Sequence, residues 1–399
     1  MTATTDLIER WERSIMHTYA TPPVALVRGQ GARVWDADGV EYVDMMAGIA
    51  VNALGHAHPA IIEAVAAQLA TLGHTSNLAA NLPSIHLAER LLELSGRRDG
   101  RVFFCNSGAE ANEAAFKIAR RTGRGGVIVA DRSFHGRTIG ALSWTAQPAK
   151  QQPFLPLPGD VTVVPFGDVD AMDAAVSQGT AAVVLEPIQG EGGVHVPPDG
   201  YLAAVEQICR ERGALLALDE VQTGIGRTGW WFAHQRDDIS PDVMMLAKGL
   251  AGGLPIGACI AWGETADLLG PGMHGSTFGG SPVNCAAALA VLDVLAADDV
   301  LTRVRTLEGK LREGLVANGG ELTTGVRGRG LLLAVELSAD VAPGVERAAR
   351  HRGLLVGTVA PNAIRLAPPL TLTDDDVHVF LERWAAALRD VIRNREDAA

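Results

Sequence analysis

Short apolar runs alternate with amphipathic segments through the middle of this 399-residue chain, from about residue 59 to residue 297. This alternation is typical of βα units around a mostly parallel sheet, so the sequence predicts an α/β fold. The candidate buried strands are residues 101–105, 126–130, 161–166, 181–185, 215–218, 243–247 and 257–262. Ligands of open α/β sheets bind beyond the carboxyl ends of the strands. The residues that follow these runs are therefore the first candidates for a functional site.

A different pattern begins near residue 298. Five apolar residues recur at the spacing of one helix face, namely Leu301, Val304, Leu307, Leu311 and Leu315. Gly319 follows them as a helix stop. Strand-like runs at 331–337 and around Arg365, and a helix capped by Thr373, complete this part. We therefore expect an N-terminal segment, 1–58, that packs across two domains, a large domain, 59–297, and a small α+β domain, 298–399.

Charge and composition exclude several classes of protein. The chain carries 34 basic and 46 acidic residues, a formal net charge of −12, so nothing directs its surface toward nucleic acid or anionic lipid. Neither a signal-peptide core nor a run of about eighteen apolar residues occurs, so we expect a cytoplasmic protein with no membrane partner. Four cysteines lie far apart, without metal-ligand or disulfide-scaffold spacing: Cys105, Cys209, Cys259 and Cys285. We therefore expect no metal.

Small residues follow the run at 101–105 and begin an expected helix. Ser107 and Glu110 have the spacing of a capping box, which by itself predicts only a well-capped helix. A helix N-terminus that begins with Gly108 and Ala109 also offers free N–H groups and a favourable dipole to a phosphate. No lysine follows as in a Walker loop, so the segment indicates a different kind of phosphate site or no site.

Two carboxylates, Asp219 and Glu220, directly follow the apolar run at 215–218. Burying them is costly unless a partner compensates for their lost hydration. A loop turn or a metal site would do so. A protonated pyridine nitrogen would also satisfy one carboxylate, as the electron-sink chemistry of pyridoxal phosphate requires. The residues alone leave these alternatives open.

Lysine is scarce, with four lysines against thirty arginines, and Lys248 is the most unusual of the four. It stands between the apolar run at 243–247 and a glycine-rich stretch, whereas Lys150 lies in an expected loop. A lysine at a strand end is most often a surface residue whose amine reaches solvent. Desolvated beside an electrophilic cofactor, however, the amine loses its proton more readily and becomes a nucleophile.

Other expected strand ends carry Phe134, His135 and Arg137. Phe134 and His135 also suit an ordinary core. Arg137 and Arg365 lie next to apolar sequence, where a guanidinium needs a carboxylate or phosphate partner. That partner is either a ligand or an internal carboxylate such as Glu191 or Asp219.

Taken together, these motifs resemble the class III pyridoxal-phosphate-dependent aminotransferases over nearly the whole chain. The matching stretches are GIAVN at 48–52, GHAHP at 55–59, FCNSGAEAN at 104–112, FHGR at 134–137, EPIQGEGG at 186–193, LDEVQTG at 218–224, AKG at 247–249, GSTFGG at 275–280 and RLAPP at 365–369. The resemblance implies PLP-transferase fold type I, with a large domain around a mostly parallel sheet. The intact Lys248, Asp219 and Gln222 argue against a non-catalytic binding protein. A dinucleotide-binding dehydrogenase would need a G-x-G-x-x-G at a strand-to-helix turn with a following acidic residue, which the chain lacks.

The resemblance also implies roles for particular residues. The catalytic pair is Lys248, which holds the cofactor as a Schiff base and moves a proton, and Asp219, which contacts the pyridine nitrogen. Phe134 stacks on the ring and Gln222 reaches its hydroxyl. Thr277 contacts the phosphate of the neighbouring subunit's cofactor, so a homodimer with shared active sites is implied. The full cofactor set is Ser107, Gly108, Ala109, Phe134, Asp219, Glu220, Val221, Gln222, Lys248 and Thr277.

Substrate residues follow from the same resemblance. Arg137 is expected to bind the substrate α-carboxylate, Glu191 to neutralise Arg365 when no second carboxylate is present, and Ser276 to contact substrate from the other subunit. Ornithine-specific relatives have a tyrosine where this chain has Gly48, and a glycine leaves room for an acylated amine. We therefore expect N-acetylornithine and 2-oxoglutarate as substrates, in arginine biosynthesis. The alternative is another ω-amine substrate: ornithine, 4-aminobutyrate, succinylornithine or succinyldiaminopimelate.

Overall fold

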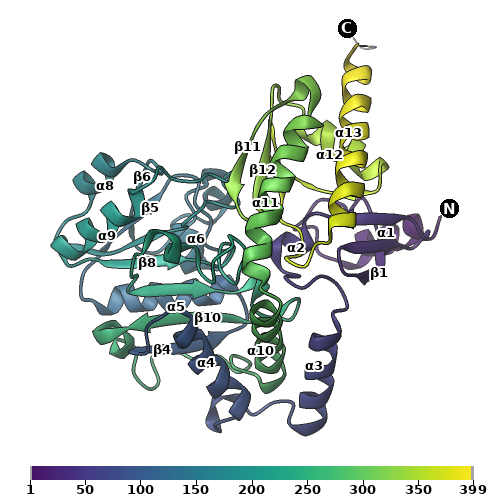
Figure 1. Ribbon diagram of the computed structural model, residues 1–399. Helices are drawn as coiled ribbons and strands as arrows, with labels where there is room; N and C mark the ends of the chain where they lie inside the picture. The colour runs from purple at the N-terminus through teal and green to yellow at the C-terminus, as the bar shows by residue number, and fades with distance from the viewer. Residues whose placement is uncertain (1, 397–399) are drawn as a thin grey trace.

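The computed structural model describes residues 2–396, and a seven-stranded sheet forms the centre of its larger part (Figure 1). In spatial order the strands are β4 (Gly100–Cys105), β10 (Gly257–Trp262), β9 (Val243–Leu246), β8 (Leu215–Asp219), β7 (Thr180–Leu185), β5 (Gly126–Ala130) and β6 (Asp160–Val164). β10 runs antiparallel to both its neighbours, and the pairs from β9 to β6 are all parallel. The predicted α/β fold with a mostly parallel sheet is therefore confirmed.

Two predicted strands end earlier than expected. β6 ends at Val164 rather than at residue 166, because Pro165 has no N–H to donate to a neighbouring strand. The N–H of Phe166 instead donates to the Asp131 carboxylate at 2.8 Å. β9 ends at Leu246, one residue before the expected end, because the chain turns at Ala247.

Helices cover both faces of this sheet, which is why its strands are apolar without alternation. On one face, α5 (Gly108–Arg121) buries an alanine stripe against Val127 and Val129 of β5. On the other, α8 (Val169–Ala175) and α9 (Tyr201–Arg212) pack on Ile128 of the same strand. The shorter α6 (Ile139–Trp144) and α7 (Pro148–Gln151) follow β5. The stretch around Lys150 is therefore a short helix, not the loop that the sequence predicted.

The C-terminal part contains an antiparallel sheet in the order β11 (Thr323–Arg329), β12 (Leu332–Leu337), β15 (Ala363–Leu366) and β14 (Gly357–Ala360). Three helices accompany it: α11 (Val300–Ala317), α12 (Ala342–His351) and α13 (Asp374–Glu396). The predicted apolar face of α11 is buried at Val304, Leu307, Leu311 and Leu315. The hydroxyl of Thr373 accepts a hydrogen bond from the Asp376 N–H at 3.1 Å, as expected of a cap.

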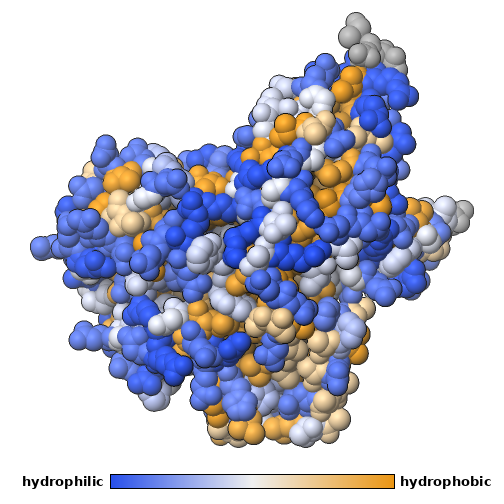
Figure 2. Space-filling view, in the orientation of Figure 1, coloured by the Kyte–Doolittle hydropathy of each residue, from blue (hydrophilic) through white to orange (hydrophobic). Residues whose placement is uncertain are grey.

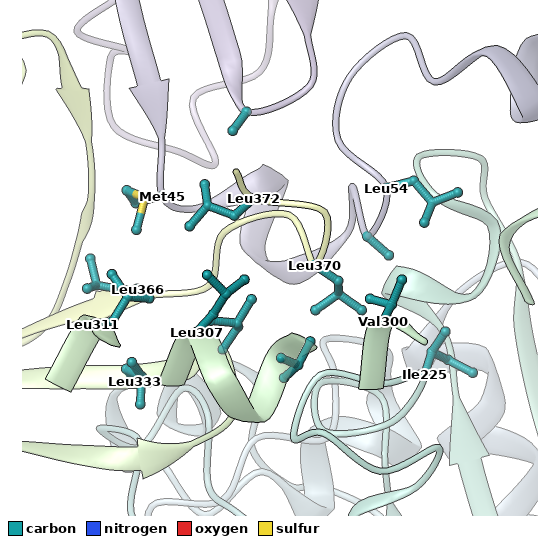
Figure 3. Packing of buried hydrophobic residues seen from close by; sticks show 14 of the residues in the cluster. Met45, Leu54, Ile225, Val300, Leu307, Leu311, Leu333, Leu366, Leu370 and Leu372 are labelled. Atoms are coloured by element: carbon teal, nitrogen blue, oxygen red, sulfur yellow. The ribbon is translucent and has the colours of Figure 1, made fainter. Parts of the chain in front are cut away.

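The N-terminal part is tied to the C-terminal part by a shared sheet. After α1 (Ala3–Ser14), the strands β1 (Leu26–Gln30), β2 (Arg33–Asp36) and β3 (Glu41–Asp44) form a meander, and β13 (Leu354–Leu355) adds to β3 in parallel. The short α2 (Ala47–Ala50) leads to α3 (Pro59–Thr71) and α4 (Leu82–Leu94), which pack on α10 (Pro282–Ala297). Figure 3 shows Met45, Leu307 and Leu366, from the N-terminal segment, α11 and β15, in one hydrophobic cluster.

The domain boundaries at residues 58 and 297 stay a prediction, and Met1 and residues 397–399 lie outside the described residues. Among the helices of residues 2–396, none has the length and apolar character needed to cross a membrane. The cytoplasmic location likewise stays a prediction from the sequence.

Candidate active site

A cavity of about 430 Å³ lies beyond the carboxyl ends of the parallel strands. Asn106 follows β4, Phe134 follows β5, Glu186 follows β7 and Lys248 follows β9, while Asp219 ends β8. This is where a doubly wound sheet is expected to bind its ligand. Nine of the residues singled out from the sequence line the cavity: Ser107, Gly108, Ala109, Phe134, Arg137, Asp219, Val221, Gln222 and Lys248.

Lys248 enters the cavity from a strained turn. It has a left-handed φ of 43° at the start of the short 3₁₀ helix η4 (Lys248–Ala251), directly after β9. A non-glycine residue in this region of backbone conformation is held there by its surroundings and is common at functional sites. Burial lowers the pKa of the Lys248 amine, although the charge of Glu191 opposes that shift. The amine is therefore better suited to act as a nucleophile or a base than an exposed lysine is.

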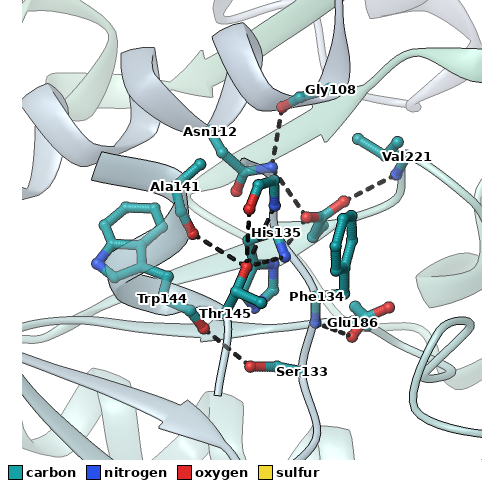
Figure 4. Close-up of polar contacts among 12 residues, drawn as sticks. Gly108, Asn112, Ser133, Phe134, His135, Ala141, Trp144, Thr145, Glu186 and Val221 are labelled. Carbon is teal, nitrogen blue, oxygen red and sulfur yellow. Dashed lines mark hydrogen bonds and ion pairs between the residues drawn. The ribbon is translucent and has the colours of Figure 1, made fainter. Parts of the chain in front are cut away.

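Asp219 is 4% exposed and lies in a network of three donors. Its Oδ2 accepts hydrogen bonds from His135 Nδ1 at 2.7 Å and from Asn112 Nδ2 at 2.9 Å, and its Oδ1 accepts one from the Val221 N–H at 3.1 Å. Burial opposes protonation of His135, but the hydrogen bond to Asp219 and the charges of Asp219 and Glu186 together outweigh it and raise the pKa of the imidazole. Figure 4 shows His135 and Asn112 approaching the same carboxylate from different segments. The carboxylate is thereby held in one orientation as an anion.

Sequence reasoning missed the roles of Asn112 and His135. Asn112 is fully buried on α5, whose other buried residues are alanines and Ile118. A polar residue on the buried face of a helix needs a hydrogen-bond partner. The position of Asn112 on that face could have been read from the helical spacing in the sequence. From the sequence, His135 also suits an ordinary core, and nothing in its neighbours along the chain indicates that its partner is 84 residues away.

The N-terminus of α5 presents unused backbone donors to the cavity. The Ser107 hydroxyl caps the helix by accepting from the Glu110 N–H at 3.2 Å. The Glu110 carboxylate accepts from the N–H of Asn106, at 2.9 Å, so the predicted capping box is displaced by one residue. The N–H groups of Gly108 and Ala109 have no protein acceptor within residues 2–396. A Cβ on Gly108 would lie 2.7 Å from Val221 Cγ1, so only glycine lets the chain approach this closely.

Arg365 and Glu191 form an ion pair behind the cavity wall. The Arg365 side chain is buried, and its guanidinium donates to the Glu191 carboxylate. Burial raises the pKa of Glu191, but the charges of Arg365 and Lys248 and the hydrogen bonds from Arg365 and Gln222 together outweigh it and lower the pKa overall. Gln222 lines the cavity, and its Oε1 accepts a hydrogen bond from Arg365 Nη1 at 3.4 Å. The sequence had left open whether the partner of Arg365 is a ligand or an internal carboxylate, and in this structure it is Glu191.

Besides Arg365 and Glu191, three predicted site residues lie outside the cavity of this chain. Neighbouring side chains in extended backbone point to opposite sides, so Glu220 points away from the cavity that Asp219 faces. Glu220 is fully buried and accepts from the N–H groups of Ala233 and His234 at 3.0 and 2.9 Å. Thr277 is exposed, and the Ser276 hydroxyl accepts from Asn106 Nδ2 at 3.1 Å. The Glu220 carboxylate therefore has internal partners, and its expected cofactor contact stays a prediction.

Glu186 is a further cavity residue whose ionisation the sequence did not predict. It accepts hydrogen bonds from the N–H groups of Phe134 and Gly190, both at 3.1 Å, yet burial raises its pKa to about 7. A carboxyl whose folded pKa is raised holds its proton to higher pH than in the unfolded chain. The stability that this proton confers is therefore lost as the pH rises from about 4.5 to about 7.

We expect Glu186→Gln to remove this pH dependence. Between pH 5 and pH 8, the unfolding free energy of the cofactor-free native protein should fall relative to that of the variant, by up to about 3 kcal/mol. Urea unfolding of both proteins at the two pH values measures the difference. The absolute stability of the variant is not the readout, because glutamine replaces one acceptor by a donor. Parallel pH profiles would contradict the prediction.

The comparisons with known proteins agree with this site. The family model for class-III aminotransferases matches residues 15–388, so the chain belongs to the class-III aminotransferases and is an enzyme of that kind. An acetylornithine aminotransferase of Mycobacterium tuberculosis is 59% identical over 388 residues, which cover 97% of each chain. Another from Streptomyces coelicolor is 58% identical over 377 residues, 94% of each chain.

Solved structures give the same result for the fold. An ornithine aminotransferase from Toxoplasma gondii, with PLP at partial occupancy in its active site, has a TM-score of 0.94 at 34% identity and covers 99% of this chain and 97% of its own. An N-acetylornithine aminotransferase from Stenotrophomonas maltophilia has a TM-score of 0.83 at 38% identity, over 97% of this chain and 100% of its own. Both structures superpose on almost the entire chain, so the likeness covers the whole fold and not one domain alone.

Proposed function

We propose that this aminotransferase moves the δ-amino group of N-acetyl-L-ornithine to 2-oxoglutarate, giving N-acetyl-L-glutamate 5-semialdehyde and L-glutamate, a step of arginine biosynthesis. The observation that carries the proposal is the set of acetylornithine aminotransferases that are 50 to 59% identical over nearly the whole chain. The geometry of the cavity is compatible with this reaction.

Pyridoxal 5'-phosphate is the cofactor of this proposal, and the cavity residues fit it. The unused N–H groups of Gly108 and Ala109 suit a phosphate, because they lie at the N-terminus of α5, which is the positive end of the helix dipole. The Asp219 anion suits a protonated pyridine nitrogen, and Lys248 would hold the aldehyde end. When bound, the cofactor supplies an electron sink for the charge left on the substrate carbon.

The protein's own part in the reaction is binding, orientation and proton transfer. The lowered pKa of the Lys248 amine favours its neutral form, which can take a proton from the substrate carbon and return it. Asp219 keeps a fixed negative charge in a buried place, because His135 and Asn112 both donate to it. Such a preorganised charge needs no rearrangement while the reaction proceeds.

Arg137 is the proposed contact of the substrate α-carboxylate. It lines the cavity, is exposed, and forms no ion pair among residues 2–396. We expect Arg137→Ala to raise the KM for N-acetylornithine by roughly 10- to 100-fold, since a charge-assisted hydrogen bond to a carboxylate is lost. Steady-state kinetics at saturating 2-oxoglutarate measures this change. An unchanged KM would remove Arg137 from the substrate site.

The turn at Gly48 supports an acylated substrate. Gly48 has a φ of 66°, within a run of four left-handed residues from Ala47 to Ala50, and Val51 directly after it lines the cavity. A side chain at Gly48 would be strained by this backbone whatever the space around it. The alternative substrate is ornithine or another ω-amine. The likeness to the structure of an ornithine aminotransferase favours this alternative.

One experiment separates these substrates. The visible absorbance of the purified holoenzyme is recorded, then N-acetylornithine and 2-oxoglutarate are added in separate steps. The proposal expects the first addition to bleach the cofactor band and the second to restore it. A band that only ornithine or 4-aminobutyrate bleaches would retain the aminotransferase and reject N-acetylornithine.

We also propose a homodimer with shared active sites. Figure 2 shows apolar side chains gathered at the lower end of the molecule, over the segment that joins α3 to α4. Leu78 is 98% exposed, Leu82 is 67% exposed and Phe278 is 62% exposed, next to the exposed Thr277. Apolar side chains with such exposure favour burial against a second copy. Sedimentation equilibrium should give twice the chain mass of 41.9 kDa.

A further inference from the structure

A second cation lies over the same aromatic ring as Arg137. The Nζ of Lys150, on α7, lies 5.8 Å from the centre of the Phe134 ring, and the guanidinium carbon of Arg137 lies 5.8 Å from the same centre. Phe134 and Arg137 both line the catalytic cavity. A lysine that the sequence places in a loop therefore shares the Phe134 ring with the expected substrate arginine, whose charge acts on it.

Lys150 is held in this place by a chain of hydrogen bonds. Its amine donates to the side-chain oxygen of Gln147. The nitrogen of the same amide donates to the backbone oxygens of Arg132 and Ser133, at 3.1 and 3.2 Å. These two residues directly precede Phe134. The position of the ammonium group is thus fixed relative to the segment that carries Phe134 and Arg137.

The two cations have no internal anion between them. Within residues 2–396, no carboxylate oxygen lies within 4.0 Å of the Lys150 amine or the Arg137 guanidinium. Burial lowers the pKa of Lys150, and the charge of Arg137 lowers it further, while Glu191 opposes both. Glu191 is already paired with Arg365. Two neighbouring cations that repel each other are stabilised when an anion binds to both.

We propose that Lys150 and Arg137 together form a subsite for the substrate carboxylate farther from the reacting amine. This carboxylate is the α-carboxylate of N-acetylornithine and the γ-carboxylate of glutamate or 2-oxoglutarate. The inference rests on the proposed function, because it assigns a specificity residue to that reaction. Lys150 supplies charge and one donor to the carboxylate, and Gln147 positions it.

The test uses a probe that binds without reacting. N-acetyl-L-norvaline has the carboxylate and the acetamide of the proposed substrate but lacks its δ-amine. Isothermal titration calorimetry of the holoenzyme should give about tenfold weaker binding for Lys150→Met, which keeps an apolar stem and removes the charge. Lys150→Arg, which keeps the charge, should stay within about threefold of the native protein. Lys310→Met is the matched control, because Lys310 is an exposed lysine of α11 paired with Asp374.

Kinetics provide a second readout and separate the two proposals. With N-acetylornithine, Lys150→Met should raise KM about tenfold and leave kcat within about twofold, while an alkylamine without a carboxylate should react equally with both proteins. If the native enzyme does not turn over N-acetylornithine, the proposed function fails, and calorimetry with 2-oxoglutarate still tests Lys150. Native-like binding of N-acetylnorvaline and 2-oxoglutarate by both Lys150→Met and Lys150→Gln would overturn the subsite.

Discussion

Lys248→Ala is expected to lose turnover by at least about 10⁴-fold, the largest effect of any single substitution in this chain. The substitution removes both a nucleophile and a proton-transfer group, and each of these contributes several orders of magnitude to catalysis. The lowered pKa of the Lys248 amine and its place in the cavity wall indicate both roles. Single-turnover measurements with N-acetylornithine, followed by cofactor absorbance, would quantify the loss.

Added small amines distinguish proton transfer from a collapsed site. If Lys248→Ala retains its fold, an amine such as methylamine should restore part of the rate in proportion to its concentration, because a free base can reach the emptied position. Lys310→Ala controls for the loss of a lysine elsewhere, since its partner Asp374 lies on the surface. Native turnover by Lys248→Ala would contradict the assignment of the catalytic lysine.

The residues that follow the buried strands could be predicted because an apolar run is local information, although β6 and β9 end one or two residues earlier than expected. Asp219 and Lys248 each follow an apolar run, and the doubly wound topology brings the ends of such runs to one edge of the sheet. The same local reasoning does not show which way the Glu220 side chain points, because adjacency along the chain does not mean that two side chains share a face. It also failed for β13, whose two residues are too few for any period to appear.

Long-range partners could not be predicted from the patterns. His135 contacts a carboxylate 84 positions away, and the ion pair of Arg365 with Glu191 spans 174 positions. Each of these contacts depends on how two elements pack, which neither propensity nor spacing encodes. The pKa of Glu186, raised to about 7, depends in the same way on the burial that the whole fold creates.

Asp219→Asn is expected to lower kcat by about 10³-fold while the cofactor remains bound to Lys248. The amide has nearly the shape of the carboxylate, so the hydrogen bond from His135 can remain, but the negative charge is lost. Without that charge the site no longer favours a protonated pyridine nitrogen, and carbanion stabilisation decreases. Rapid-mixing kinetics of the first half-reaction, with cofactor content measured separately, tests both parts of the expectation.

A graded series tests whether charge or orientation matters more at this position. Asn112→Ala removes one of the two side-chain donors to Oδ2 and leaves the carboxylate charged, so its kcat should fall only about tenfold. A shift of the pH profile of kcat is also expected for this variant, because His135 is then the only side chain that donates to Asp219. If Asp219→Asn stays within tenfold of the native rate, the buried charge is not what activates the cofactor. If instead Asn112→Ala matches the loss in Asp219→Asn, the orientation of the carboxylate is as important as its charge.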